Sequence, residues 1–244
     1  MSCYRVIRLA VHQKAAGFSL VEMAIVLVIV GLLLAGLLPT ISSQIEQQRR
    51  NETRKQMEEI KESLVGFAIS KGYLPCPAVS ASSGVEDRSA TACNKRIGFV
   101  PWVTLGVSKT DGWGRIFRYS ATHAFTNSSA VFATGTLRDI TIKTRDATGT
   151  LTNLSNTDDI PAVILSHGRN GYGATLYSGV TFGGVSTTNV DEQKNVTGDG
   201  TGKTFIFREQ SDNTSTSGGE FDDLVVWLSP NILFNRMVAA GKLP

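Results

Sequence analysis

The chain has 244 residues, of which 41% are hydrophobic and 18% are charged, a composition that excludes wholesale disorder. This length accommodates one sizeable domain with an appendage, or two small domains. The formal net charge of +3 includes three basic residues, Arg5, Arg8 and Lys14, in a first stretch of 17 residues that contains no acid. The remainder is formally neutral, so the basic pI reports a short tail and we predict no nucleic-acid partner.

A long apolar segment follows the basic tail. Residues 18–38 read FSLVEMAIVLVIVGLLLAGLL, with Glu22 as the single charge. A helix of this length spans roughly 30 Å, the thickness of the hydrocarbon core of a bilayer, so we predict a transmembrane helix over about 18–38. A cleaved secretory signal fits less well, because the apolar run is too long and no small-x-small site closes it. An ordinary signal anchor with Glu22 among the lipid headgroups stays an alternative.

The helix is expected to continue beyond Pro39, which should kink it or let it melt locally because proline lacks an N–H group. Residues 46–55 are polar on every face and predict a solvated helical stalk. Apolar residues then recur at steps of three and four, which predicts an amphipathic end that covers a sheet. We therefore predict one helix over 18–72, ended by Gly72 and Pro75. The periodic apolar positions are Ile41, Ile45, Met57, Ile60, Leu64, Phe67 and Ala68.

Residues 73–244 form the expected globular, β-rich part. Short runs of β-branched and aromatic residues are separated by turn residues, and no second helical period is evident between them, which predicts an antiparallel sheet. A short closing helix is expected over 231–240. The predicted fold class is α+β, with a long N-terminal helix packed on an antiparallel β-sheet. The expected strands are 99–105, 115–120, 130–133, 139–144, 162–166, 174–181, 204–208 and 221–228.

The three cysteines divide between the two parts of the chain. Cys3 lies in the basic tail, which leaves Cys76 and Cys93 as one possible pair. Two cysteines at this spacing lack the two close pairs of a four-ligand zinc site. A disulfide in an oxidising compartment is the better interpretation, and it should contribute about 3 kcal/mol of stability.

The order of features at the N-terminus carries a family resemblance. The basic tail ends at Gly17, and Phe18-Ser19-Leu20-Val21-Glu22 leads into the apolar run. This order resembles the cleavage and methylation signal of type IV prepilins. The resemblance implies that a membrane aspartyl peptidase cuts after Gly17 and methylates Phe18, so that Glu22 becomes the fifth residue of the mature chain. Gly31 and Pro39 also stand where pilins commonly have these residues.

The resemblance implies a structural subunit of a type IV pilus or a type II secretion pseudopilus, with no catalysis and no cofactor. In a filament of packed helices, Glu22 would neutralise the α-ammonium group of Phe18 on a neighbour. The implied partners are prepilin peptidase, other pilin or pseudopilin subunits and an inner-membrane assembly platform. A membrane-anchored periplasmic binding domain or enzyme stays the alternative. The choices between pilus and pseudopilus, and between major and minor subunit, stay open.

The resemblance also implies a location in the inner membrane, with a single pass. Residues 1–17 would form a cytoplasmic leader and residues 73–244 a periplasmic domain, which later reaches the filament or the cell surface. Flanking charge alone does not orient the span, since three basic residues precede it and four follow within the relevant range. The expected disulfide and the family resemblance favour this orientation.

Three further motifs resemble segments of the major secretion pseudopilins. They are DGWGRIFRY at 111–119, LSHGRNG at 165–171, and GGEFDDL at 218–224 followed by Trp227. Extra sequence around 121–160 and 175–217 favours a minor or divergent member. The last loop of those pseudopilins holds calcium, which offers Asp222 and Asp223 as oxygen ligands, although Asn170 stands where the family more often has Asp. Solvated turn carboxylates are the simpler interpretation, so we predict no metal site.

Overall fold

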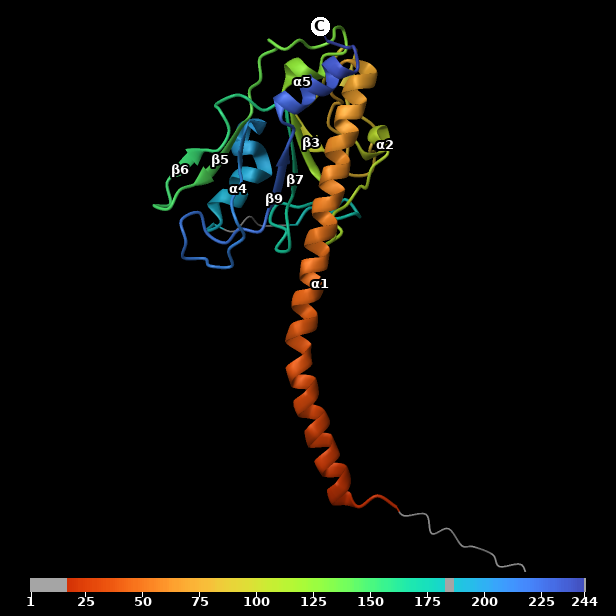
Figure 1. Ribbon diagram of the computed structural model, residues 1–244, viewed down its shortest axis with the longest axis vertical. Helices are drawn as coiled ribbons and strands as arrows, with labels where there is room; N and C mark the ends of the chain where they lie inside the picture. The colour runs from red at the N-terminus through yellow and green to blue at the C-terminus, as the bar shows by residue number, and fades with distance from the viewer. Residues whose placement is uncertain (1–16, 183–186, 244) are drawn as a thin grey trace, which may run out of the picture. The chain divides into compact units, whose positions relative to one another are not determined.

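Figure 1 presents the computed structural model of the chain, which describes residues 17–182 and 187–243; the side chains of residues 34–40 are outside the description. The predicted leader lies almost wholly outside the described residues. The chain divides into two compact units, with the boundary between Glu46 and Gln47.

The first element is one long helix, α1 (Leu20–Lys71), which confirms the predicted helix to within two residues at its start and one at its end. It begins after Ser19, whose Oγ accepts a hydrogen bond from the backbone N–H of Glu22 at 3.2 Å. This is one half of a capping box, and the acidic Glu22 also suits the positive end of the helix dipole. The backbone stays helical through Pro39, so the expected local melting is wrong, while the kink stays a prediction. Gly72, with φ of 86°, ends the helix.

The second unit is built around a four-stranded antiparallel sheet in the order β3 (Ile97–Phe99), β4 (Arg118–Ala121), β7 (Ala162–Ser166) and β9 (Leu224–Trp227). Every residue of β7 is buried, because both faces of this sheet are covered. Ile164 belongs to the apolar core shared with α1, whereas Val163 and Leu165 belong to a second core on the opposite face. The alternation follows from the two-residue period of a strand.

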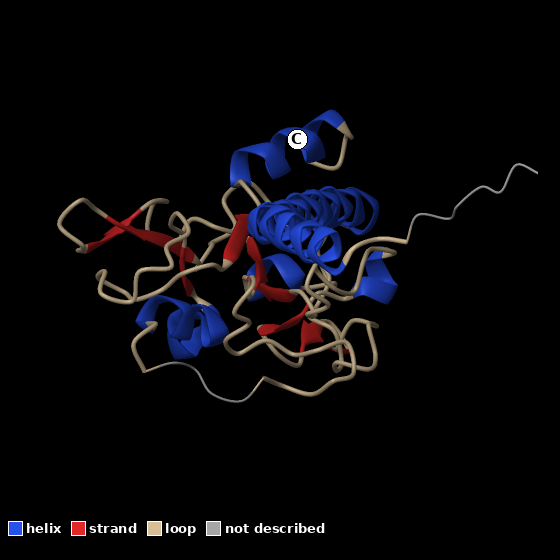
Figure 2. Cartoon of the chain, turned by 90° about the horizontal axis from the view of Figure 1, so that it is seen from below, coloured by secondary structure: helices blue, strands red, loops and turns tan. Residues whose placement is uncertain are grey.

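The C-terminal part of α1 covers one face of this main sheet. Met57, Ile60, Leu64 and Ala68 are fully buried, at the three- and four-residue steps that the sequence predicted. The closing helix α5 (Pro230–Ala239) confirms the expected helix at 231–240 and contributes buried side chains to the same core. Figure 2 shows α5 on one side of the part of α1 that belongs to this unit, and the strands on the other side.

A second sheet packs on the other face, in the order β6 (Leu151–Asn153), β5 (Thr141–Arg145) and β8 (Thr204–Ile206). Its apolar residues, including Ile142 and Phe205, meet Val163, Leu165 and Val225 of the main sheet. Strands β5 and β8 are parallel, which differs from the expected purely antiparallel arrangement. The long connection between them makes a parallel pairing possible. A small hairpin of β1 (Arg88–Ser89) and β2 (Ala92–Cys93) completes the strands of the described residues.

Several short helices correct the prediction that no helix lies between the strands. The expected strand 99–105 is wrong beyond Phe99, because Pro101 breaks the pairing and α2 (Trp102–Leu105) follows it. Further helices are α3 (His123–Thr126) and α4 (Val190–Thr197). The segment η1 (Gly198–Gly202), which follows α4, is a tight turn, because Asp199 and Gly200 have positive φ angles. Such short segments contain too few turns to show a helical period in the sequence.

Two expected strands do not form. Residues 130–133 are irregular, and their apolar character reflects Phe132, which is buried against Phe125 and Phe234. Residues 174–181 form a hairpin-like loop with two isolated bridges, one between Thr175 and Thr181 and one between Leu176 and Arg115. The expected strands 115–120, 139–144, 162–166, 204–208 and 221–228 contain or overlap β4, β5, β7, β8 and β9.

Candidate functional site

The N-terminal candidate residues lie together at the start of α1. Gly17 and Phe18 directly precede the helix, and 79% of Phe18 is exposed. A Cβ added at Gly17 would meet no described atom within 4 Å, so packing within the described chain does not require glycine there. The side chain of Glu22 is exposed and stands beside the exposed apolar residues Leu20 and Val21.

Membrane crossing is a separate matter from helix formation. Within the part of the chain whose side chains are described, no helix is long and apolar enough to span a membrane. Residues 34–38 of the expected span lie outside that part. The transmembrane helix over about 18–38 therefore stays a prediction.

The predicted disulfide is confirmed. Cys76 and Cys93 are bonded, and both side chains are buried or nearly so. The bridge joins the segment directly after α1 to strand β2. Nearby, Glu86 accepts a hydrogen bond from the backbone N–H of Cys76 at 3.0 Å and pairs with Arg88 at 3.0 Å. The loop between helix and main sheet is thus held by a covalent bond and an ion pair.

The three motifs that resemble pseudopilin segments meet in space. Asp111 of the first motif accepts a hydrogen bond from Ser166 Oγ of the second at 2.6 Å. It also accepts backbone N–H bonds from Trp113 and Arg115, which fixes the tight turn. The backbone N–H of Asn170 in the second motif donates to Asp222 of the third at 2.8 Å. Hydrogen bonds therefore join the three motifs from one to the next.

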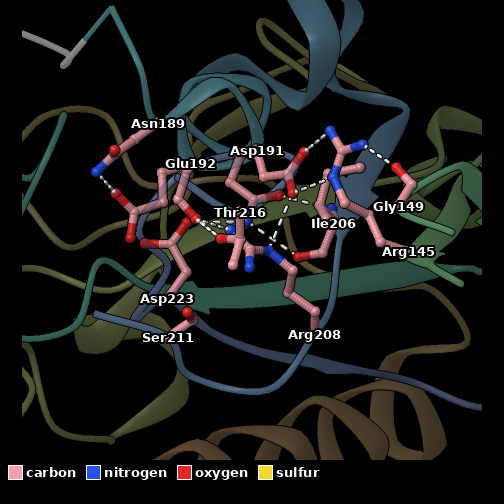
Figure 3. Close-up of polar contacts among 12 residues, drawn as sticks. Arg145, Gly149, Asn189, Asp191, Glu192, Ile206, Arg208, Ser211, Thr216 and Asp223 are labelled. Carbon is pink, nitrogen blue, oxygen red and sulfur yellow. Dashed lines mark hydrogen bonds and ion pairs between the residues drawn. The ribbon is translucent and has the colours of Figure 1, made fainter. Parts of the chain in front are cut away.

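A cluster of three buried carboxyl groups lies at the third motif. Glu192 from α4 and the neighbouring Asp222 and Asp223 each offer one oxygen, and these oxygens lie within 4.8 Å of one another. Figure 3 shows the Glu192 and Asp223 carboxyl groups next to each other. Asp222 and Asp223 are buried, so the interpretation of both as solvated turn carboxylates is wrong.

The hydrogen bonds of this carboxylate cluster (Glu192, Asp222 and Asp223) are incomplete. Glu192 accepts bonds from the side-chain amides of Asn170 and Asn189 and from the backbone N–H of Asp222. One oxygen of Asp222 and one of Asp223 have no hydrogen-bond partner among the described residues. A buried polar atom without a hydrogen-bond partner costs free energy, so a ligand that binds these two oxygens would stabilise the fold.

The pKa values of the three carboxyl groups are shifted upward by burial. Burial raises the pKa of Asp222 and of Asp223 to about 8 each, and burial together with the charge of Asp223 raises the pKa of Glu192 to about 7. His167 Nδ1 lies 3.5 Å from Asp223, but burial lowers the pKa of His167 to about 3, so this imidazole is neutral. The positive charges of Arg115 and Arg208 oppose the upward shift of the two aspartates in part, but burial dominates, so the two aspartates favour the protonated form unless a cation binds.

The cluster fits the calcium ion that the resemblance implies. Two oxygens bound to one calcium ion lie at most about 5 Å apart, and hard carboxylate oxygens are its preferred ligands. The unpartnered oxygens of Asp222 and Asp223 belong to the two residues that the resemblance offered as ligands. Bound calcium would give these two oxygens a partner.

A groove of about 790 Å³ lies between residues 47–58 of α1 and the edge strand β9. Its walls carry charges of both signs, from Arg50 and Arg54 on the helix and Glu209 on the opposite side. Small-molecule sites typically combine an apolar lining with a few convergent polar groups. The mixed charges of this open groove do not form such a set, and we assign no ligand to it.

Comparison with known proteins identifies the N-terminal feature. A family profile described as "Prokaryotic N-terminal methylation motif" matches residues 12–38, which include Gly17, Phe18 and Glu22. The chain carries a prepilin-type signal. This signal is typical of type IV pilins and pseudopilins, and it implies processing by prepilin peptidase. No curated protein and no solved structure matches the chain.

Sequence reasoning missed the third member of the carboxylate cluster. Glu192 lies about thirty residues before Asp222, in a segment for which the sequence analysis predicted neither a helix nor a strand. The pattern Asn189-x-x-Glu192 at the start of a polar run is typical of a helix N-terminus, and it was the one available indication of α4. That indication concerns the helix alone, and nothing in it places Glu192 beside the two aspartates.

Proposed function

We propose that the chain is a structural subunit of a type IV pilus or a type II secretion pseudopilus. Prepilin peptidase would cut it between Gly17 and Phe18 and methylate Phe18. The observation that carries this proposal is the match of the methylation motif to residues 12–38, which brackets the cleavage point. The α+β fold, with a long helix packed on an antiparallel sheet, agrees with such a role. The subunit itself would have no catalytic activity.

Before assembly the subunit would be stored in the inner membrane. The apolar residues 18–38 would cross the bilayer, with the leader in the cytoplasm and residues 73–244 in the periplasm. The disulfide between Cys76 and Cys93 supports an oxidising compartment for the globular part. The assembly platform and other subunits would then move this chain from the membrane into a filament.

Glu22 would set the register of the subunit in the filament. A carboxylate within an apolar helix costs on the order of 2.5 kcal/mol in a bilayer, so its presence calls for a compensating partner. The free α-ammonium group that cleavage creates on Phe18 of a neighbouring subunit would be that partner. A competing role is local, because Glu22 occupies the third helical position after the cap Ser19.

The substitution Glu22→Ala separates these roles when it is compared with Ser19→Ala. We expect Glu22→Ala to insert and be cleaved, because loss of a charge eases insertion, but to be depleted at least about tenfold from sheared filaments. Ser19→Ala removes the helix cap and costs about 1 kcal/mol locally, and it should still enter filaments. Immunoblots of membrane and filament fractions give both quantities.

If Glu22→Ala enters filaments as well as the wild type, the pairing with Phe18 is wrong. If the wild type is cleaved but never enters a pilus or pseudopilus fraction, the filament role itself is wrong. The alternative, a membrane-anchored periplasmic binding domain or enzyme, would then be the better description.

A further inference from the structure

The two edges of the main sheet differ in how the chain covers them. At the β3 edge, the backbone N–H of Ala78 donates to the carbonyl of Phe99 at 2.9 Å, so the segment that follows α1 pairs with this edge. At the other edge, β9 pairs with β7 alone among the described strands. An open edge presents unpaired backbone groups, with which a strand from another chain can pair.

The register shows which backbone groups of β9 face outward. Directly after β9, the N–H of Leu228 donates to the carbonyl of Ala162 at 2.9 Å. Because backbone groups alternate in direction along a strand, Val226 also bonds to β7, whereas Val225 and Trp227 direct their N–H and C=O groups to the open edge. These outward groups form no backbone hydrogen bond with a described residue. Val225 is only 4% exposed, and buried backbone groups without a partner are rare, so this edge suits a further strand.

The groove beside β9 lies along this edge, and all of its lining residues belong to the second unit. Val226 packs in the core shared with α1, whereas Val225 and Trp227 pack in the second core. Phe207 lies edge-on against Trp227, with ring centroids 5.5 Å apart, so residues 207–210 line the groove on the second-core side. A strand added to β9 would follow the same alternation, and its side chains would face α1 and residues 207–210 in turn.

The two walls of the groove differ in charge. On the α1 wall, Arg54 is exposed and forms no ion pair with a described residue, whereas Glu58 is paired with a lysine of the same helix. On the opposite wall, Glu209 is exposed, whereas Arg208 is held by Asp191 at 3.0 Å. The α1 wall therefore favours acidic side chains, and the opposite wall disfavours them.

We propose that this groove binds an extended acidic segment of a partner protein, which joins the main sheet as a further strand beside β9. Main-chain hydrogen bonds to Val225 and Trp227 hold the segment. Its acidic side chains face Arg54, and the alternate side chains, which face Glu209, are neutral or basic. In strand addition, main-chain bonds supply affinity and the alternating side chains supply specificity. This binding depends neither on cleavage of the leader nor on the filament role.

The first test uses the full chain in detergent and a fluorescent peptide of about seven residues, a common strand length, in which glutamate and threonine alternate. We expect saturable binding by fluorescence anisotropy and slower hydrogen exchange in residues 224–228. Arg54→Ala should weaken binding by about two- to fivefold, as for an exposed ion pair. Lys55→Ala is the matched control, because Lys55 pairs with Glu59 and does not line the groove. A glutamine–threonine peptide should bind the wild type and Arg54→Ala equally.

A second pair of peptides tests the main-chain bonds. Methylation of the backbone nitrogens in one alternate set of residues removes the donors that face β9, and it should weaken binding at least about tenfold. Methylation of the other set, whose N–H groups face away from β9, should leave binding nearly unchanged. The side chains are the same in both peptides, so the comparison isolates the main-chain contribution.

Four outcomes would overturn the proposal. The first is the absence of saturable binding of the glutamate–threonine peptide to the wild type. The second is an equal loss of affinity in Arg54→Ala and Lys55→Ala, which would remove the acidic preference of the α1 wall. Equal effects of the two methylated sets would contradict strand addition. Protection of residues 224–228 that appears without peptide and grows with protein concentration would identify a second copy of the chain as the occupant.

Discussion

The two ends of α1 are both rich in apolar residues but meet opposite surroundings. Near its C-terminal end, Leu64 is fully buried against the main sheet and α5. Near its N-terminal end, 67% of Leu27 is exposed, and its neighbours Ile25 and Val28 are more than half exposed as well. The first set is covered by the chain itself, whereas no described part of the chain covers the second.

This difference indicates which apolar surface is buried by folding of the chain and which is left for contact with a membrane or another protein. Contiguous exposed apolar surface of this extent is rare on soluble monomers and marks membrane or protein contact. The match to the methylation motif, at residues 12–38, includes these exposed apolar residues.

The largest expected effect is at the cleavage position. Gly17→Phe should leave nearly all of the chain as full-length precursor in the membrane, because the peptidase site must accommodate the residue before the cut. Gly31→Phe is the matched control, since a Cβ at either glycine meets no described atom within 4 Å. It should be processed normally. Immunoblots that resolve precursor from mature chain report both, and equal processing of the two variants would argue against cleavage after Gly17.

The contrast between the two ends of α1 predicts unequal costs for one substitution. Leu64→Ala should lower the free energy of unfolding of the globular part by about 2–5 kcal/mol, because it leaves a cavity in the core. Leu27→Ala should change that free energy by less than about 0.5 kcal/mol. Denaturant titrations of the full chain in detergent measure both values. Similar losses in both variants would contradict the division into a covered and an uncovered end.

Loss of the disulfide should lower the free energy of unfolding by an amount within the range expected for Leu64→Ala. Replacing Cys76 and Cys93 together by serine should cost about 3 kcal/mol, mainly through the freedom that the unfolded chain regains. Membrane insertion should be unaffected, since the bridge lies after α1. Thermal melts with and without reductant provide the control, because the variant should no longer respond to reductant. A wild type that melts alike in both conditions would show that the bridge contributes nothing.

The parts of the fold that were predictable depend on local sequence. The long helix, strand β7 and the disulfide follow from apolar periodicity, β-branched composition and cysteine spacing. Helix α4 was not predicted, because its sequence VDEQKNVT contains little apolar surface. It is held by ion pairs of Asp191 with Arg145 and Arg208. Both arginines lie outside α4, so no local sequence pattern reveals these pairs.

The candidate sites show the same division. Gly17, Phe18 and Glu22 form a contiguous motif, so sequence alone could propose them as processing and assembly residues. Asp222 and Asp223 are buried beside Glu192 and His167, which come near them only in the folded chain. Two adjacent aspartates in a Gly-rich segment look like solvated turn residues when such tertiary contacts are unknown.

The mass of the mature N-terminal peptide shows whether the chain is cut and methylated as a prepilin. Mass spectrometry of the chain recovered from its native membrane should find a peptide that begins at N-methylated Phe18 and lacks residues 1–17. The methyl group adds about 14 Da to that peptide, and its mass distinguishes methylation from simple cleavage. An unprocessed Met1 terminus, or a mature terminus at any residue other than Phe18, would contradict processing as a prepilin.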